Sequence, residues 1–468
     1  MKNSFLAALP CAAAAAALSG CLLGPDYERP DPAVAQDSFR RAGVSGENAV
    51  SEAGAAGESR DGSWWSAWSD PEIARLVSEA CATNISLAQA AARVRQARAS
   101  LETARAALRP SLGLSGSASA GKTYDPDSSA RTVRGGGEAG WEIDLFGANR
   151  RSAEAAGADE AAALQEEAGV RLALCAETAS AYVELRLAEA LLAISRENLA
   201  SAEESLEIAR AKDSSGMEAG SGLAASEASV ASARAAVPAR EAAASAAARA
   251  LEALLARPPF ALEGALAGES GAVPEPPEPP ETSPAEVVAR RPDVLRAEAS
   301  LHAATARVGA ARAARYPAVN LAAGVSVSAS SLTDWERKTT DLSFGPSVSV
   351  PLFRGGALAA AEERARAAAD EALLAWRDAV LSAVHEAQDA WTRYDSELAR
   401  RADVALAAEK EAEALEAAVS LWKAGSGSYE AVISRRQALL SARQGVAQNA
   451  ADRALLAITL YKALGGAP

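Results

Sequence analysis

The chain has 468 residues, a formal net charge of −14 and only 4% aromatic residues. Its length allows two or three domains. The scarcity of aromatic residues and the abundance of alanine favour closely packed helices over a large globular core, because alanine stabilises the helix itself. The negative charge argues against binding to nucleic-acid phosphates. Only two histidines, His302 and His385, and four cysteines are present, so we expect no catalytic, cofactor-binding or metal-binding residues.

The first 20 residues are typical of a bacterial signal peptide. Phe5 to Leu18 form an apolar run that is too short to span a bilayer as a helix. The tetrad Leu18-Ser19-Gly20-Cys21 that ends it resembles the lipobox of bacterial lipoproteins. This predicts cleavage before Cys21 and a covalent lipid on that residue, and Leu22 in the next position resembles the signal for outer-membrane sorting. The alternative is an ordinary secretory signal with a chance cysteine.

Residues 21–69 lack periodicity, and we expect a lipid-anchored, irregular tether. The three tryptophans that end it belong either to a membrane-interface belt or, as we favour, to the packing of the helical region; they are Trp64, Trp65 and Trp68. Cys81 and Cys175 follow within helical patterns. We expect buried free thiols there, with a disulfide as the alternative, because the sequence alone does not bring the two residues together.

Residues 70–257 form a first repeat unit, which begins with the helix-start signal Asp70-Pro71. Leucine and alanine alternate with serine in strand periodicity, which predicts two strands at about 111–121 and 133–145. Each has the length of a tilted membrane-spanning strand. A long helix pair is expected over 148–257, and its first helix would be about 95 Å long at 1.5 Å per residue.

Residues 258–284 are rich in proline and predict an extended linker. The same succession of elements then returns over 285–464, with strands at about 318–331 and 341–350 and a long helix pair over 356–464. Three anchor points keep an offset of about 205–207 residues between the two copies. We therefore interpret the chain as a tandem repeat in which each copy inserts a β-hairpin between long helices.

Four membrane-type strands leave two open edges, and open edges are not stable in lipid. The chain is therefore expected to oligomerise into a barrel, of 8 strands for two copies or 12 for three. The faces with serine, glycine and asparagine would line a pore, and those with leucine, valine and alanine would face lipid. The charged helices would then project from the barrel as a helical tube, which is the architecture of a conduit.

Several motifs, in order along the chain, resemble those of TolC-type outer-membrane efflux channels, in their NodT-like lipoprotein branch. They are Cys21 with Gly24-Pro25-Asp26-Tyr27-x-Arg29-Pro30, Trp64-Trp65-x-x-Trp68-x-Asp70-Pro71, Trp141-Glu142-x-Asp144-Leu145-Phe146-Gly147, Arg290-Arg291-Pro292-Asp293-Val294 and Pro351-Leu352-Phe353-x-Gly355-Gly356.

This resemblance implies a mixed membrane α+β fold. Three chains would form a homotrimer with a 12-strand outer-membrane β-barrel that continues into a 12-helix periplasmic α-barrel. It implies no enzyme, but a passive conduit that exports drugs or other toxic small molecules. The expected partners are a periplasmic adaptor protein, an inner-membrane transporter of the resistance-nodulation-division type and the lipid of the outer membrane.

The resemblance also assigns roles to the two turns between the long helices. The expected adaptor-contact tips are Gly220, Ser221, Gly222, Gly425, Ser426 and Gly427. The helix after the second turn carries the closed-state gate in the family, and the candidate gate residues here are Glu430, Ser434 and Gln437. Ser434 stands where the family usually has an aspartate. Glu430 is therefore either the source of an acidic ring or a solvated helix residue.

Two further readings of the function stay open at this stage. One is an outer-membrane channel for protein or metal secretion. Only Met217 would remain as a methionine after removal of the signal, which argues against a path for soft metal ions lined by methionine. The other is a lipid-anchored periplasmic coiled-coil scaffold without a pore, which the four alternating strands argue against. Three aromatic residues near the strand ends belong either to an interfacial girdle or to the core: Trp141, Phe344 and Phe353.

Overall fold

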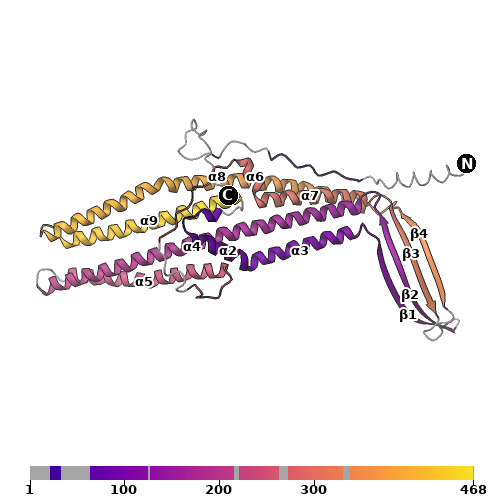
Figure 1. The fold of residues 1–468 in the computed structure, drawn as a ribbon, viewed down its shortest axis with the longest axis horizontal. Coiled ribbons are helices and arrows are strands. Elements are labelled where there is room, and N and C mark those ends of the chain that lie inside the picture. The colour runs from indigo at the N-terminus through magenta and orange to yellow at the C-terminus, as the bar shows by residue number, and fades with distance from the viewer. Residues whose placement is uncertain are drawn as a thin grey trace. The chain divides into compact units, whose positions relative to one another are not determined.

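The computed structural model describes residues 22–32, 39, 64–124, 127–215, 221–262, 272–329 and 338–466 (Figure 1). The described residues divide into two compact units. Unit 1 comprises 22–31 and the described parts of Ala91–Glu166 and Leu295–Ala379. Unit 2 comprises the described parts of Pro32–Ala90, Glu167–Val294 and Val380–Pro468. Each unit therefore takes segments from both sequence repeats.

Unit 1 contains an antiparallel sheet with the strand order β1-β2-β3-β4 (Figure 1). The strands are β1 (Ser111–Tyr124), β2 (Asp127–Ile143), β3 (Ala318–Ala329) and β4 (Thr339–Ser349). The second hairpin agrees with the sequence prediction within two residues at each end.

The first hairpin is longer than predicted at its turn. Its ladder continues to the pair Tyr124–Asp127, so most of the segment between 121 and 133 belongs to the strands. Those predicted inner ends were wrong, because polar and turn-forming residues also pair in this antiparallel ladder. At its other end β2 stops at Ile143, two residues before the predicted end.

Four helices contribute to unit 1: α3 (Ile85–Ala106), α4 (Ala148–Ser214), α7 (Pro292–Ala313) and α8 (Ala357–Lys423). Only the parts of these helices that lie within the residue ranges of unit 1 belong to it. Ion pairs link α3 to α4 there, Arg93–Glu166 at 3.1 Å and Arg98–Glu160 at 2.8 Å. Arg315, which follows the end of α7, pairs with Glu362 of α8 at 2.6 Å.

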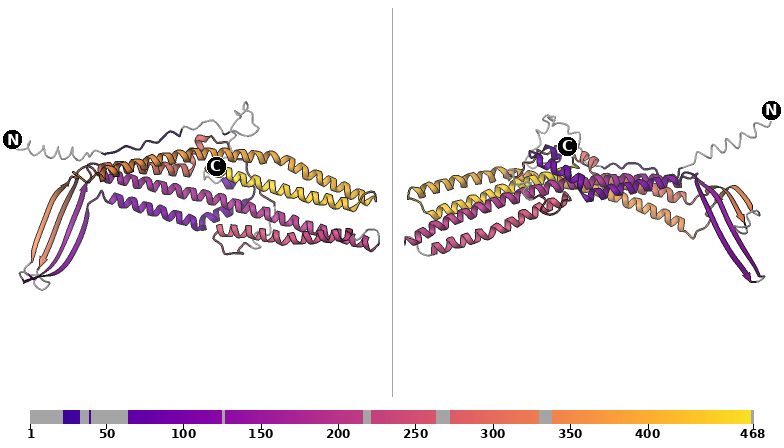
Figure 2. Two further views of the ribbon diagram at one scale, coloured as in Figure 1. Left: turned by 180° about the vertical axis from the view of Figure 1, so that it is seen from behind. Right: turned by 60° about the horizontal axis from the view of Figure 1, so that its bottom comes forward.

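Unit 2 contains the remaining parts of the long helices together with shorter elements. These are the 3₁₀ helix η1 (Trp64–Ala67), α2 (Pro71–Thr83), α5 (Ser221–Leu254), α6 (Pro284–Arg290) and α9 (Tyr429–Ala463). Within this unit α4 and α5 lie side by side, and so do α8 and α9 (Figure 2). The helix α5 continues through Pro238.

The helix starts follow their local sequence signals. The side chain of Asp70 accepts a hydrogen bond from the Glu72 N–H and caps α2, and Ser283 with Glu286 forms a capping box at the start of α6. The helix α7 begins at Pro292, directly after the end of α6. Arg291 ends α6 in an extended conformation, because the following proline disfavours the helical region for this residue.

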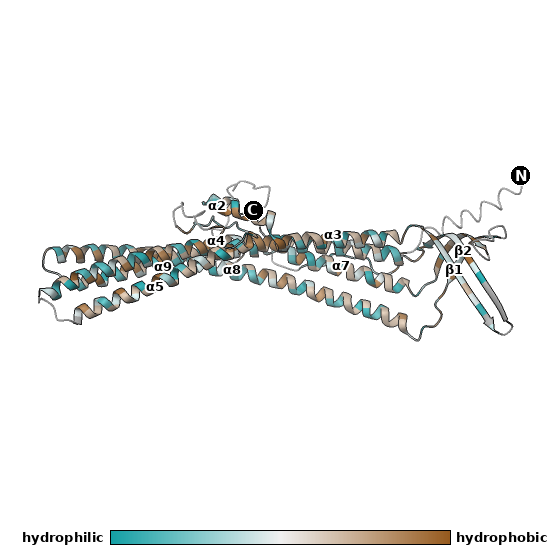
Figure 3. Cartoon of the chain, turned by 90° about the horizontal axis from the view of Figure 1, so that it is seen from below, coloured by the Kyte–Doolittle hydropathy of each residue, from teal (hydrophilic) through white to brown (hydrophobic). Residues whose placement is uncertain are grey.

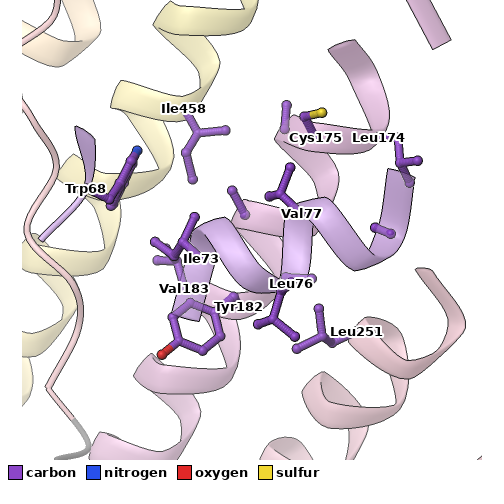
Figure 4. Close-up of a cluster of buried hydrophobic side chains, with 14 of the residues drawn as sticks. Trp68, Ile73, Leu76, Val77, Leu174, Cys175, Tyr182, Val183, Leu251 and Ile458 are labelled. Atoms are coloured by element: carbon purple, nitrogen blue, oxygen red, sulfur yellow. The ribbon is translucent and has the colours of Figure 1, made fainter. Parts of the chain in front are cut away.

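The largest apolar cluster of unit 2 forms where α2 packs on α4, α5 and α9 (Figure 4). Ile73, Leu76 and Val77 of α2 are fully buried there. Trp64 and Trp68 are buried in the same cluster, and the Trp64 ring stacks on Tyr461 at 5.2 Å. These two tryptophans are therefore core residues, as favoured, and do not form a membrane-interface belt.

Hydrophilic and hydrophobic residues mix along the helices (Figure 3). Among the described residues, no helix combines the length and the apolar composition that crossing a membrane requires.

Candidate functional site

The four-stranded sheet of unit 1 has one apolar and one polar face. Directly opposed residues of neighbouring strands lie on the same face of a sheet. One row of such residues crosses all four strands as Leu114, Gly137, Val325 and Leu342, and the adjacent row on that face as Leu112, Ala139, Ala323 and Phe344. The faces expected from the alternating sequence are thus confirmed.

The large side chains on the apolar face are more exposed than is usual for apolar residues on the surface of a soluble protein. The exposed fraction is 90% for Leu114, 84% for Leu342 and 74% for Phe344. A contiguous apolar surface of this kind marks contact with protein or membrane. Phe344 is not a core residue of its own chain, which favours the girdle interpretation. Trp141 is half-buried and donates its indole N–H to the carbonyl of Leu108 at 3.1 Å.

The polar face consists of small residues with a few charges. Ser115, Gly136, Ser326 and Asp341 form one row, and Gly113, Glu138, Gly324 and Ser343 form the next. A hollow of about 200 Å³ lies over these rows. A Cβ atom on Gly136 would come within 2.7 Å of the Val325 carbonyl oxygen, so glycine is needed there. This face offers hydroxyl groups and carboxylates to water.

The strands β1 and β4 form the two edges of the described sheet, since each pairs with one neighbour only. Their outer backbone groups have no strand partner within the described chain. A sheet that carries an apolar face and open edges is incomplete as a membrane structure, because unpaired backbone groups are costly in lipid.

The first strand-to-helix junction, residues 144–147, is covered by the N-terminal segment 22–31. The Leu23 N–H donates to the Phe146 carbonyl at 3.3 Å. The buried guanidinium of Arg151 donates to the Leu23 carbonyl at 3.1 Å and to Asp26 at 2.6 Å. The segment predicted as an irregular tether has no helix or strand over 22–32, yet it is fixed along unit 1 by these contacts.

Glycines allow this segment to approach so closely. Gly24 has a φ of +96°, and a Cβ atom there would overlap the Cα of Gly309. Gly147 has a φ of +80°, and its Cβ would come within 2.5 Å of the Leu22 side chain. The sequence motif that begins at Gly24 is therefore a docking motif. The role of Gly309 was missed, because a single glycine within a helix gives no signal of a distant contact.

Two aromatic and ionic contacts extend the docking of the same segment. The Tyr27 ring stacks on His302 at 4.4 Å, and Arg29 pairs with Glu298 at 2.9 Å. Burial and the charge of Glu298 raise the pKa of Tyr27 to about 12. The residues that directly follow the predicted lipid site are thus anchored in unit 1, whereas Cys21 itself lies outside the described residues.

The second junction, residues 351–356, has no comparable cover within the described chain. Leu352 is 91% and Phe353 is 89% exposed. Gly355 and Gly356 have positive φ values of 56° and 83°, and no atom lies within 4 Å of a Cβ built on either. Phe353, like Phe344, is therefore not a core residue of its own chain.

In unit 2, the turn between α8 and α9 is built from the predicted glycines. Gly425 adopts a φ of +72°, and the N–H groups of Ser426 and Gly427 both donate to the Leu421 carbonyl at 3.0 Å. Ser428 then caps α9 by accepting from the Ala431 N–H at 3.2 Å. Of the corresponding first turn, Gly220 lies outside the described residues, Ser221 is described in its backbone only, and Gly222 lies in α5.

The candidate gate residues line a cleft of about 330 Å³ between α4, α5 and α9 near these turns. Glu430, Ser434 and Gln437 lie one turn apart on one exposed face of α9, so the structure brings all three together. The sequence did not point to Lys212 of α4. Its ammonium group lies on the same cleft, 5.9 Å from the centre of the Tyr429 ring.

Ion pairs connect the two helix pairs beside this cleft. Arg436 of α9 pairs with Glu204 of α4 at 2.6 Å, and Arg443 pairs with Glu197 at 3.0 Å. The Arg436 side chain is partly buried and the other three are about half exposed, and such surface pairs contribute about 0–1 kcal/mol each.

A family model described as "Outer membrane efflux protein" matches residues 76–257 and 284–466. The chain belongs to the outer membrane efflux protein family. The two matched segments lie on either side of the Pro-rich linker. Membership makes the chain an efflux channel of the bacterial outer membrane and not an enzyme, and it decides against the scaffold without a pore.

Similar proteins cover nearly the whole chain. Nodulation protein T of Rhizobium leguminosarum bv. trifolii is 28% identical over 96% of this chain and 95% of its own length. The cation efflux system protein CusC of Escherichia coli K12 is 28% identical over 97% of each chain. The pyoverdine export outer membrane protein OpmQ of Pseudomonas aeruginosa is 30% identical over 86% of this chain and 87% of its own.

Solved structures share the fold. The outer-membrane channel OprN has a TM-score of 0.81 at 27% identity and covers 95% of this chain and 99% of its own. The open state of the MtrE outer membrane channel of Neisseria gonorrhoeae has a TM-score of 0.80 at 26% identity, covering 95% and 98%. The fold is therefore that of TolC-like outer-membrane channels, mostly helical with a small antiparallel sheet.

Proposed function

We propose that three copies of this chain form a passive export channel, in which 12 strands close a barrel in the outer membrane and 12 helices form a tunnel in the periplasm. The observation that carries the proposal is the sheet. Its four strands have one apolar face, one face of serine and glycine, and two open edges. Three such sheets would close edge to edge, and 12 strands leave room for a pore.

The charges on the polar face predict the ion preference of the pore. Arg134, Glu138, Glu142 and Asp341 share this face by their pairing register. Each chain would thus contribute one cation and three carboxylates to the lumen. A lumen with excess negative charge concentrates cations, so we expect a pore that prefers cations.

Planar-bilayer recordings test the channel directly. The purified protein should insert as a trimer and conduct with a preference for cations. The variant Glu138→Gln combined with Glu142→Gln should lower that preference while leaving insertion intact. The pair Glu72→Gln and Glu79→Gln on α2, outside the sheet, serves as a control of equal charge. A protein that never inserts, or that inserts as trimers and passes no current even with its partner, would contradict the channel.

We further propose that the turns at the ends of the helix pairs bind a periplasmic adaptor protein, which connects the channel to an inner-membrane transporter of the resistance-nodulation-division type. The cleft beside Tyr429 supports this, because it presents apolar surface together with Lys212 and Glu430. A partner helix would find both a hydrophobic contact and charge complementarity there. Candidate gate residues on the same cleft would sense such binding.

Cysteines placed at Ser221 and Ser426 provide the test of this contact. In cells that contain the adaptor, each should cross-link to it under short-range bifunctional reagents. A cysteine placed at Ser100 on the exposed surface of α3 is the matched control and should not cross-link. Equal cross-linking to the adaptor at all three positions would show that the tips are not its specific binding site.

The transported compounds are proposed to be small molecules that are toxic to the cell. The relatives are named for cation efflux and for pyoverdine export, so the family accommodates more than one cargo. Loss of the chain should raise susceptibility to several unrelated compounds at once. If the cells became sensitive to a single metal ion only, the alternative of a metal exporter would be favoured. If their susceptibility did not change but a protein were no longer secreted, protein secretion would be favoured.

Lipid attachment at Cys21 completes the proposal. The anchored segment 22–31 would hold a lipid on that residue beside the strand-to-helix junction, where a barrel leaves the membrane. Mass spectrometry of the N-terminal peptide should detect acyl chains on Cys21. The variant Cys21→Ser should keep its signal peptide or lose the lipid, and an unmodified Cys21 in the mature protein would contradict this step.

A further inference from the structure

The fold brings together the two cysteines that the sequence left apart. Cys81 of α2 and Cys175 of α4 are separated by 94 positions, yet their Sγ atoms lie 3.6 Å apart. Cys175 is buried, and Figure 4 shows it on α4 among the side chains that pack against α2. Cys81 is only half-buried. The pair lies within unit 2 and shares no residue with the tip cleft.

Both cysteines lie on helices whose positions are fixed by other contacts. The Tyr182 hydroxyl donates to the Asp70 carboxylate at 2.6 Å at the start of α2. At its end, Asn84 donates to the Leu254 carbonyl at 2.9 Å. Apolar packing of α2 on α4 holds the middle. The sulfur atoms therefore meet because the helices are docked, and a covalent bond of about 2.05 Å needs a further approach of the two sulfur atoms.

We propose that Cys81 and Cys175 form an intramolecular disulfide in the mature protein. The inference rests on the outer-membrane location, which places the helices of the chain on the periplasmic side, where disulfides form and persist. It does not rest on the pore or on the partners. The cross-link would join α2 to α4 and close a loop that contains α3, β1 and β2.

The local environment favours oxidation through Cys81. The hydrogen bond from Cys175 and the charge of Arg171 lower the pKa of Cys81 to about 7, although burial opposes this. A thiolate is the form that attacks a disulfide, and Cys81 is the more accessible of the two. The hydrogen bond to Cys81, burial and the charge of Cys81 raise the pKa of Cys175. The two contributions from Cys81 disappear once that residue has reacted.

The reaction balances with a disulfide-bearing thiol oxidase as the oxidant. The Cys81 thiolate attacks one sulfur of the oxidase disulfide, which breaks that bond and leaves a mixed disulfide and one oxidase thiolate. Deprotonated Cys175 then attacks the Cys81 sulfur. The Cys81–Cys175 bond forms, and the second oxidase thiolate leaves. Two electrons and two protons pass to the oxidase, which becomes a dithiol.

The disulfide would join α2 and α4 covalently, in addition to their apolar packing. The closed loop spans 94 positions, and long loops gain the most from a cross-link because the unfolded chain loses the most freedom. The cross-link would keep α2 docked when neighbouring helices of unit 2 move apart.

Peptide mapping of the full-length protein tests the pairing. The chain is exported through an oxidising periplasm, extracted from outer membranes in detergent, denatured and alkylated before digestion. A cross-linked peptide that joins Cys81 to Cys175 is expected, with neither residue alkylated until a reductant is added. Because the peptides are identified individually, the thiols of Cys11 and Cys21 are not confused with those of Cys81 and Cys175. Alkylation of both residues without reductant, or disulfides between chains, would overturn the proposal.

Thermal unfolding provides a second readout. Reductant should lower the unfolding midpoint of the natural protein by about 5 °C or more, from the loop entropy of a cross-link. The variants Cys81→Ser, Cys175→Ser and the double variant should unfold at the lower midpoint and should not respond to reductant. If the serine variants unfold early while the natural protein ignores reductant, the two cysteines contribute only by packing and the disulfide is excluded.

Discussion

The two strand-to-helix junctions of unit 1 arise from similar sequence patterns but have different surroundings. At the first, the N-terminal segment covers the turn, and Arg151 joins Leu23 to Asp26. At the second, Leu352 and Phe353 are exposed and the glycines have open space around them. The same sequence motif thus makes different contacts in the two repeats. The first junction is completed by its own chain, and the second has the surface that a neighbouring copy would cover in the proposed trimer.

The largest expected effect comes from filling the glycine contact at the first junction. Gly24→Ala places a Cβ atom on the Cα of Gly309 and strains a residue with positive φ. We expect the docked segment 22–31 to lose about 3 kcal/mol of local stability. Hydrogen exchange of this segment measures the loss.

The matched control is Gly355→Ala at the second junction. Its φ is also positive, but no atom lies within 4 Å of the new Cβ, so we expect only the conformational cost of about 1 kcal/mol. Equal effects of the two substitutions would show that the difference between the junctions has no energetic consequence.

Arg151 is the next strongest difference. Its side chain is 2% exposed and bonds to Leu23, Asp26 and Glu154. Arg151→Met keeps the apolar stem and leaves these oxygen atoms without their donor, which should cost about 2–3 kcal/mol. Faster chymotrypsin cleavage after Tyr27 is the expected readout. The control is Arg354→Met at the exposed second junction, which should change stability by less than about 0.5 kcal/mol. If Tyr27 stayed protected from cleavage in the Arg151→Met variant, Arg151 would not be what holds the segment in place.

An acid-sensitive contact follows the second junction. Hydrogen bonding from Arg315, together with the charges of Arg366 and Arg315, lowers the pKa of Glu362 despite the opposing effect of burial. A lowered carboxylate pKa stabilises the fold above the unfolded value of about 4.3 and loses this contribution as the pH falls through the folded value.

Glu362→Gln should therefore cost about 1 kcal/mol at neutral pH, since both arginines are half exposed. The cost should become smaller near pH 3, which lies below the ordinary carboxylate pKa. Thermal unfolding at both pH values measures it, with Glu363→Gln on the exposed face as the control. A cost that is independent of pH would rule out the carboxylate charge as its source.

The smallest effect on the single chain is expected at Phe353. Because this ring is 89% exposed, Phe353→Ser should change the unfolding of one chain by less than about 0.5 kcal/mol. If a neighbouring copy covers the second junction, the same substitution should lower the fraction of trimer on native gels. Phe146→Ser is the counterpart, whose ring packs on Tyr316 at 4.9 Å and should destabilise the chain itself. A full trimer yield with Phe353→Ser would leave the second junction outside the interface.

Much of the fold follows from periodicity and helix signals. The strand alternation placed the second hairpin within two residues, and the glycine turn at 424–427 marked the end of α8. The first hairpin was predicted too short, because a polar sequence gives no signal for a ladder that continues to its turn. In the tip cleft, the three residues on α9 were predicted from one helix, whereas Lys212 comes from another helix and had no local signal.

By itself, the sequence determined the order of elements, the tandem repeat, the two faces of the sheet and the membership of a channel family. These properties depend on residues that are near in the chain, where side-chain spacing decides which face is apolar. Only the tertiary structure decided that Gly24 lies on Gly309, that Cys81 meets Cys175 and that one junction is covered while the other is open. Such contacts join residues that are distant in the chain, and they depend on how closely two backbones approach.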